Sequence, residues 1–259
     1  MIKMIASDMD GTLLRNGAQA LSARMPRILE GLYERGILFT AASGRQYANL
    51  RNLLGSFADK AAYICENGAF AVYRGQIIYK AVMDRALGQS LMRDIQAAKD
   101  CEIQLSGVET AYIQPKSPAY TDYLVHELKN RVTVVEDIFS TREDYIKISA
   151  YVHGSRTEEW LARFREKWGG VFTLASTCDH WIDFIPPDIH KGKAMEALME
   201  AAQIKKEEVM AFGDNYNDLE LLSCAAESYA VDTAKPEVIA ACRHVCSLVE
   251  DVLEGLLEA

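Results

Sequence analysis

The order of apolar and polar positions divides the chain into alternating strand-like and helix-like segments. The short apolar segment 2–7 leads directly into two aspartates and a glycine, which is typical of a buried parallel strand that ends in a turn. Helical spacing over 21–35, a second apolar segment at 37–42 and another helical pattern at 47–54 follow it. Strand, helix, strand and helix in this order predict a doubly wound α/β sheet.

The pattern of apolar and polar positions changes in the middle of the chain. Three short apolar segments, at 61–65, 69–73 and 76–79, are separated by turn residues and predict antiparallel hairpins. From residue 82 to 185, helix-like and strand-like segments then alternate without the wound pattern. The wound pattern returns after Pro186, with the strand 209–212 between the helices 192–203 and 218–224. We therefore predict a core of residues 1–81 and 186–259 that carries an inserted α/β domain, 82–185.

Composition and charge narrow the classes of partner. The chain has 259 residues, of which 49% are hydrophobic and 25% charged, so it has the composition of a globular protein. Its formal net charge of -9 argues against a nucleic-acid partner, because binding a polyanion requires clustered Lys and Arg. A small phosphorylated metabolite is compatible with this negative net charge, since a few local donors and a bound cation outweigh the overall charge. The sequence does not predict an oligomeric state.

The six cysteines are dispersed and none forms a Cys-x-x-Cys pair, which favours reduced thiols over disulfides or a zinc site. No stretch of about 18 apolar residues occurs, so we expect no membrane-spanning helix and no membrane partner. The first residues run at once into an apolar strand pattern, without the basic and apolar parts of a secretion signal. Cytoplasmic residence is the expectation.

Candidate chemistry begins at Asp8 and Asp10. The two carboxylates lie two residues apart at the end of a predicted strand, so their side chains project the same way, and Gly11 permits a tight turn after them. Two carboxylates this close repel each other. A hard cation with oxygen ligands, Mg²⁺, would relieve the repulsion. The same cation would let an anionic phosphate approach a carboxylate nucleophile.

Three further predicted strand and helix ends carry the groups that such chemistry needs. At the end of segment 37–42, Ser43 offers a hydroxyl and Gly44 lets backbone N–H groups approach a phosphoryl group. Lys191 offers a point charge for that group. After segment 209–212 come further oxygen ligands, with Asp214 and Asn217 favoured as direct ligands and Asp218 as a ligand through water or as a partner that orients Lys191.

These residues predict a division of roles in phosphate monoester hydrolysis. Asp8 would attack phosphorus and become an aspartyl phosphate. Asp10 would protonate the leaving oxygen and then deprotonate the hydrolytic water. One acid/base would thus serve both halves of the reaction.

The same residues resemble the four motifs of the haloacid dehalogenase superfamily, and the chain most resembles its Cof-like sugar phosphatases. The motifs occur in the family's order: Asp8-Met9-Asp10-Gly11-Thr12, Ser43-Gly44-Arg45, Lys191-Gly192 and Gly213-Asp214-Asn215-Tyr216-Asn217-Asp218. The resemblance implies a Rossmann-like core, a mobile cap of type C2B and Mg²⁺-dependent hydrolysis. It also implies that Asp8 and Asp214 bind metal through their side chains and Asp10 through its carbonyl. Ser43 departs from the threonine common in the family but keeps the hydroxyl.

Two weaker candidates for substrate contact follow from the resemblance. Asn67-Gly68-Ala69 matches the family's turn beside the substrate, although Asn67 and Gly68 are equally typical of a simple turn with positive φ. Arg45 matches the second motif, where it would either approach the substrate or hold the loop.

Alternative functions remain at this stage. A phosphoryl transferase or mutase would use the same aspartyl phosphate but deliver it to another hydroxyl. A receiver-like signalling domain is disfavoured, because such domains have no insert of this size and no phospho-acceptor on the first strand. A non-catalytic metabolite-binding protein would need no nucleophile. The leaving group is expected to be selected by residues of the insert.

Overall fold

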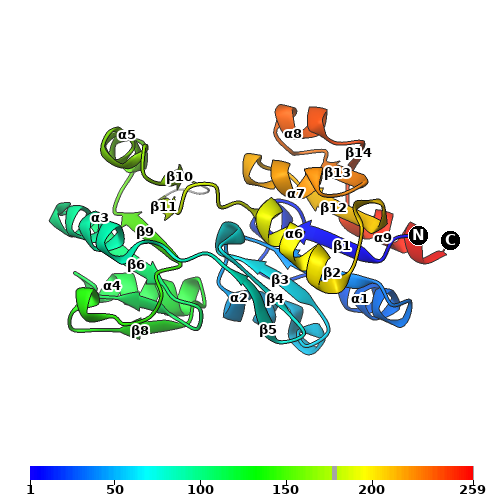
Figure 1. The fold of residues 1–259 in the computed structure, drawn as a ribbon, viewed down its shortest axis with the longest axis horizontal. Coiled ribbons are helices and arrows are strands. Elements are labelled where there is room, and N and C mark those ends of the chain that lie inside the picture. Colours follow the sequence, from blue (N-terminus) through cyan, green and yellow to red (C-terminus); the bar gives the residue numbers. More distant parts are fainter. Residues whose placement is uncertain (177–179, 259) are drawn as a thin grey trace. The chain divides into compact units, whose positions relative to one another are not determined.

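The computed structural model describes residues 1–176 and 180–258, and the chain forms two compact units. The first comprises Met1–Lys80 together with the chain from His190 onward, and we refer to it as the core unit. The second, Ala81–Ile189, is referred to as the cap unit. Each unit contains its own sheet (Figure 1). Cys178 lies outside the described residues; the five described cysteines are free thiols.

The core sheet has its functional strands at its centre. Its order is β14-β13-β12-β1-β2-β3-β4-β5, with β1 (Met4–Asp8) between β12 (Val209–Gly213) and β2 (Leu38–Ala42), all parallel. The parallel part continues through β13 and β14 on one side and β3 on the other, and the hairpins β3–β4 and β4–β5 are antiparallel. The bounds of these outer strands are β3 Ala62–Cys65, β4 Phe70–Tyr73, β5 Gln76–Lys80, β13 Glu227–Val231 and β14 His244–Cys246. The predicted doubly wound fold class is confirmed.

Helices between the strands complete the core unit. Helix α1 (Met25–Glu34) packs against α9 (Val249–Glu258) and β2, while α6 (Lys191–Ala202) packs against α7 (Leu219–Ser223) and β3–β5. The remaining helices are α2 (Tyr47–Leu54) and α8 (Pro236–Ala241). Helix α1 begins later than its hydrophobic spacing predicts because Pro26 fits only the first helical turn.

The register of the parallel strands brings three chain segments to one edge of the sheet. Asp8 is paired with Ala42 of β2, and Ser7 with Phe212 of β12. The loops that leave β1, β2 and β12 therefore start side by side. Ligand sites of doubly wound sheets lie at this carboxyl edge.

The cap unit is an antiparallel sheet with helices over one face. Its order is β10-β11-β9-β6-β7-β8, and among the residues that the structure describes only the β7–β8 pair is parallel. Helices α3 (Arg85–Ala97) and α5 (Thr157–Trp168) share a hydrophobic core with Ile103, Ile148 and Phe184 of the sheet. The strands are β6 Cys101–Ser106, β7 Ala111–Ile113, β8 Val132–Val134, β9 Lys147–Val152, β10 Thr173–Ala175 and β11 Trp181–Ile185.

The other face of the cap sheet is partly packed by α4 (Pro118–Asp122) and the π-helical turn Tyr123–Glu127, which follows it directly. Tyr120 and Leu124 form a second small cluster there with Ile113 and Trp181. Strand β8 has only three residues, which are too few for a strand periodicity to be recognised in the sequence. Within the described part of the chain, no helix combines the length and apolarity required to cross a membrane.

Candidate active site

A fully buried lysine joins two aspartates at the carboxyl edge of the core sheet. Lys191, the first residue of α6, donates from Nζ to Asp8 Oδ1 at 2.5 Å and to Asp218 Oδ1 at 2.6 Å. The side chains of Lys191 and Asp218 are fully buried, and that of Asp8 is 7% exposed. Such a buried ion pair is stable only when its polar atoms are well paired. The network therefore ties the end of β1 to the start of α6.

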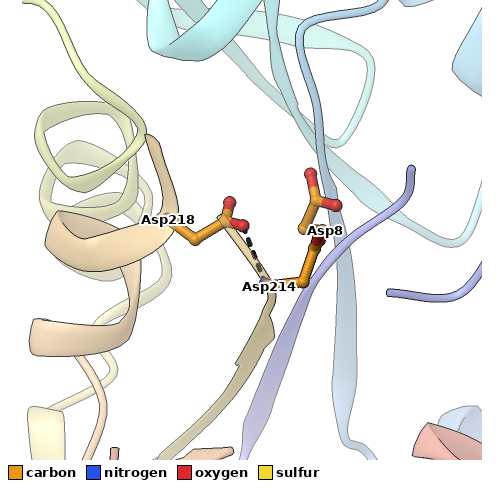
Figure 2. A group of neighbouring side chains, drawn as sticks. All are labelled: Asp8, Asp214 and Asp218. Carbon is orange, nitrogen blue, oxygen red and sulfur yellow. Dashed lines mark hydrogen bonds between the residues drawn. The ribbon is translucent and has the colours of Figure 1, made fainter. Parts of the chain in front are cut away.

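Asp218 also holds the turn after β12. Its Oδ2 accepts hydrogen bonds from the backbone N–H groups of Asp214 at 3.0 Å and Asn215 at 3.1 Å. Figure 2 shows Asp8, Asp214 and Asp218 converging from the ends of two neighbouring strands and the turn beyond. Both oxygens of Asp218 are thus engaged, one by Lys191 and one by the turn. This arrangement favours the predicted role of Asp218 as the partner that orients Lys191.

Asp214 is positioned by the segment that follows Asp8. Thr12, a buried residue, donates its hydroxyl to Asp214 Oδ1 at 2.8 Å. Gly11 has a φ of +92°, and a Cβ at this position would lie 2.4 Å from Asp214 Oδ2. Only glycine permits this approach without a clash. Thr12 is the last residue of the first motif, but its role as a partner of Asp214 was not predicted from the sequence.

Asp10 lies at the open side of the site. Its side chain is 52% exposed and receives two hydrogen bonds from Arg45, Nε to Oδ2 at 2.8 Å and Nη2 to Oδ1 at 2.6 Å. Arg45 is held in turn by Asn49, whose Oδ1 accepts from Nη1 at 3.0 Å. The Ser43 hydroxyl is 3.5 Å from Asp10 Oδ2 and accepts from the Arg45 N–H at 3.2 Å. A bidentate contact of this kind fixes the orientation of a carboxylate.

Asn67 and Asn217 meet although 150 residues separate them. Asn217 donates from Nδ2 to Asn67 Oδ1 at 3.1 Å, and the Asn67 N–H donates to the Ser43 carbonyl at 3.1 Å. Asn67 has a φ of 58°, so it is also the turn residue that its sequence suggests. A Cβ on Gly44 would lie 2.9 Å from Asn67 Oδ1. All ten predicted site residues thus belong to the core unit, where they lie at the end of β1, at the start of α6 or in the turns that follow β1, β2, β3 and β12.

The electrostatics of the buried group show an excess of negative charge. Burial, reinforced by the neighbouring Asp218 carboxylate, raises the pKa of Asp8 well above its usual range. Burial alone would lower the pKa of Lys191, but the carboxylates of Asp218 and Asp8 outweigh it and raise that pKa. Burial also raises the pKa of Asp214. One ammonium group therefore faces three carboxylates, a set that a cation would stabilise.

The donor set fits a hard divalent cation. Carboxylate oxygens of Asp8, Asp214 and Asp218 all lie within 4.8 Å of one another. Carboxylate oxygen is the ligand that Mg²⁺ prefers in proteins. Because the oxygens of Asp218 already accept three hydrogen bonds, Asp8 and Asp214 are the better side-chain ligands.

The comparison with protein families decides the assignment. The family model for haloacid dehalogenase-like hydrolases matches residues 5–259. The chain belongs to this family. The resemblance drawn from the four motifs is thereby confirmed, including its Cof-like type, and this haloacid dehalogenase-like chain is a hydrolase.

Individual relatives of this haloacid dehalogenase-like hydrolase are named as phosphatases. It is 26% identical over 243 residues to the 5-amino-6-(5-phospho-D-ribitylamino)uracil phosphatase YbjI of Escherichia coli, which covers 94% of this chain and 90% of the relative. It is 23% identical to the HMP-PP phosphatase of Cronobacter sakazakii, over 95% of this chain and 89% of the relative. A solved structure from Eubacterium rectale has a TM-score of 0.87 at 29% identity, over 98% and 99% of the chains. These names support the predicted class of phosphoric monoester hydrolase.

Proposed function

We propose that this chain is a Mg²⁺-dependent phosphatase that hydrolyses small phosphate monoesters through an aspartyl phosphate on Asp8. The observation that carries the proposal is the contact of Asp8 with Lys191 inside a group of three carboxylates. A nucleophile for an anionic phosphate needs compensating positive charge on both the protein and the metal side. Lys191 supplies the first, and the oxygens of Asp8 and Asp214, with the Asp10 carbonyl, would hold Mg²⁺ to supply the second.

The first half of the reaction forms a bond between an Asp8 carboxylate oxygen and phosphorus. The bond from phosphorus to the leaving oxygen breaks, and the carboxyl group of Asp10 gives its proton to that oxygen. Asp10 suits this task because its side chain is half-exposed at the open side of the site. Ser43 and Lys191 would donate hydrogen bonds to the phosphoryl oxygens, together with the N–H of Gly44.

The second half returns the enzyme to its starting state. Asp10, now a carboxylate, takes a proton from water, the water oxygen bonds to phosphorus and the bond from phosphorus to Asp8 breaks. Inorganic phosphate leaves. Asn67 and Asn217, which hydrogen-bond to each other, would close the side of the site next to Ser43.

The substrate we propose is a small phosphorylated metabolite, with sugar phosphates as the leading class. Support comes from the relatives, since the Escherichia coli protein is named for a substrate with a phosphorylated ribityl group. A phosphoryl transferase or mutase remains the second candidate, because it would share the same first half-reaction. A non-catalytic binding protein has no need for the buried contact between Lys191 and Asp8.

Phosphate release from 4-nitrophenyl phosphate tests the proposal. We expect release with Mg²⁺ and a loss of at least about 100-fold after chelation by EDTA, restored by added Mg²⁺, because the uncompensated carboxylates repel the substrate. Equal rates with and without EDTA would contradict the metal dependence. A second arm supplies glucose as an acceptor; transfer of the phosphoryl group to glucose instead of water would favour the transferase.

Replacement of Thr12 tests how Asp214 is held. We expect Thr12→Val to weaken Mg²⁺ binding about tenfold, because loss of a hydrogen bond to a ligating carboxylate typically costs 10- to 100-fold in metal affinity. The measurement is the Mg²⁺ concentration that half-saturates the shift in melting temperature. Thr12→Ser, which keeps the hydroxyl, serves as the matched control. An unchanged Mg²⁺ midpoint in Thr12→Val would show that the contact has no role in metal binding.

A further inference from the structure

Two turns of the core unit share the same dipeptide and the same backbone conformation. The sequence contains Asn-Gly twice, as Asn16-Gly17 in the loop after β1 and as Asn67-Gly68 in the loop after β3. Asn16 has a φ of 54° and a ψ of 34°, and Asn67 has 58° and 29°. The two glycines have φ values of 73° and 94°. A hydrogen bond between the flanking residues closes each turn, at 3.0 Å in the first and 3.2 Å in the second. Both are type I′ turns, which Asn-Gly favours.

An Asn-Gly peptide can react with itself. The backbone nitrogen of the glycine attacks the side-chain carbonyl carbon of the asparagine, a bond forms between these two atoms, and the glycine N–H gives its proton to a base of the solvent. The bond from that carbon to the side-chain nitrogen breaks, and the nitrogen takes up a proton and leaves as ammonia. Water then opens the cyclic imide at either of its carbonyl groups, which gives aspartate or isoaspartate. Water is the only other reactant.

Ring closure requires a change in the turn. In the imide the ψ of the asparagine is about -120°, which with a φ of about +60° is the first central position of a type II′ turn. The φ of both asparagines already fits this conformation. Rotation of the peptide group between asparagine and glycine then supplies the ψ and changes the sign of the glycine φ, which glycine tolerates. The reaction therefore needs space in which this peptide group can rotate.

The first turn has this space. Asn16 and Gly17 are both exposed, and a Cβ at Gly17 would have no heavy atom of the described residues within 4 Å. The Gly17 carbonyl accepts a hydrogen bond from Gln19 Nε2 at 3.0 Å, which lies in the same exposed loop. The peptide group between Asn16 and Gly17 can therefore rotate without moving a neighbouring helix or strand.

The second turn is enclosed by the candidate active site. Asn67 is 4% exposed, and a Cβ at Gly68 would lie 2.3 Å from the carbonyl oxygen of His190 and 2.6 Å from the backbone nitrogen of Lys191. The turn thus packs directly against the start of α6. The Asn67 side chain is also held, because its Oδ1 accepts a hydrogen bond from Asn217. Rotation of this peptide group requires local opening of the fold, so only the open fraction of the protein can react.

We propose that the Asn16-Gly17 turn is a site of spontaneous deamidation in the folded protein, and that packing against α6 protects the equivalent Asn67-Gly68 turn. The product has a new carboxylate next in sequence to Arg15. The guanidinium of Arg15 donates to Asp232 at 2.6 Å and to Thr233 at 3.1 Å, so it ties the loop after β1 to the loop after β13. Isoaspartate lengthens the backbone of the turn by a methylene group. Deamidation therefore alters the segment that holds this anchor.

Peptide mapping of aged protein tests the proposal. The folded protein is kept at mildly alkaline pH and then cleaved after lysine, which places Asn16 in peptide 4–60 and Asn67 in peptide 61–80. Mass spectrometry with fragmentation locates the mass increase that accompanies replacement of the side-chain NH₂ by OH. We expect Asn16 to be converted at least about tenfold faster than Asn67, because the second turn must first open. In urea, where both turns are lost, the two rates should agree within about threefold.

Gly17→Ala tests whether rotation of the peptide group limits the reaction. The added methyl group opposes this rotation and hinders the attacking nitrogen, so we expect Asn16 to be converted at least about tenfold more slowly. Gly75→Ala is the matched control, since Gly75 has a similar φ of 74° and equally open surroundings but follows an arginine. It should leave the rate at Asn16 unchanged. Continued protection of Asn67 in the same digest shows that each variant is folded.

Three results would overturn the assignment of this site. The first is equal conversion of the two asparagines in the folded protein. The second is a difference between them that persists in urea, because local sequence and not the fold would then be its cause. The third is an unchanged Asn16 in the folded protein under conditions in which the unfolded chain reacts at both dipeptides.

Discussion

Replacing Asp8 by Asn is expected to abolish phosphatase turnover while the protein stays folded. The amide is a poor nucleophile, so no aspartyl phosphate forms, and we expect kcat to fall by at least about 10⁴-fold, as when other covalent nucleophiles are removed. Steady-state release of phosphate from 4-nitrophenyl phosphate measures this loss. Acid-quenched enzyme should carry bound phosphate in the wild type and none in the variant.

The electrostatics predict that Asp8→Asn does not weaken the fold. The pKa of Asp8 is raised, so the ionised carboxylate is less favourable in the metal-free protein than in the unfolded chain. Wild-type stability from this group is thus present at low pH and lost as the pH rises through the raised pKa. The neutral Asn does not titrate. In EDTA, the melting temperature of Asp8→Asn relative to wild type should therefore increase with pH over this interval.

If Asp8→Asn does not fold, the phosphate bound to acid-quenched wild-type enzyme alone decides the role of Asp8. Retained turnover in a folded Asp8→Asn would exclude Asp8 as the nucleophile. Asp59→Asn, at an exposed carboxylate of the core unit that pairs with Arg51, is the matched control and should keep full activity.

Much of the core unit follows from local sequence. The parallel strands β1, β2 and β12 are short apolar segments, and each is followed by small or acidic residues that mark the carboxyl edge of a sheet. Because such edges coincide in space, Asp8, Ser43 and Asp214 could be placed together before the fold was known. Lys191, which was predicted as the point charge that the phosphoryl group needs, has no local signal beyond its neighbouring glycine.

The pairings within the site depend on tertiary contacts that local sequence does not encode. Lys191 contacts Asp8, from which it is separated by 183 residues in the sequence. Asp218 could either bind metal or orient Lys191, and the backbone N–H groups that its Oδ2 accepts from favour the second role. Arg45 was a candidate for substrate contact or for holding its loop, and the structure pairs it with Asp10. Loop contacts of this kind are set by the whole fold.

The cap unit was less accessible to sequence reasoning for a physical reason. Its strands β6, β9 and β11 are buried on both faces, so polar residues such as Gln104, Ser149 and Asp183 interrupt the apolar pattern without being exposed. The resulting alternation of apolar and polar residues resembles that of a half-exposed strand. Only the pairing of the strands shows that these residues form one surface.

Lys191→Met is expected to impair both stability and catalysis. Removal of the ammonium leaves the buried carboxylates of Asp8 and Asp218 without their shared partner, and breaking a buried ion pair typically costs about 3–5 kcal/mol. We expect a lower urea midpoint in EDTA. We also expect kcat to fall by at least about 10²–10³-fold, because a donor to the transferring phosphoryl group is lost.

The two roles of Lys191 can be separated by adding the cation. Mg²⁺ held by Asp8 and Asp214 neutralises part of the negative charge that the lost ammonium group leaves without a partner. Saturating Mg²⁺ should therefore recover most of the stability of Lys191→Met but little of its kcat. Lys191→Arg keeps the charge but presents a planar fork in place of a point charge, and we expect it to restore stability more than activity.

Lys193→Met, at an exposed position two residues further along α6, is the matched control. If Lys191→Met kept both the wild-type urea midpoint and kcat within about twofold, the bridge between Asp8 and Asp218 would have neither role. A purely structural lysine would instead give full activity once Mg²⁺ had restored the fold, so the kcat measured at saturating Mg²⁺ decides whether the ammonium group acts on the substrate.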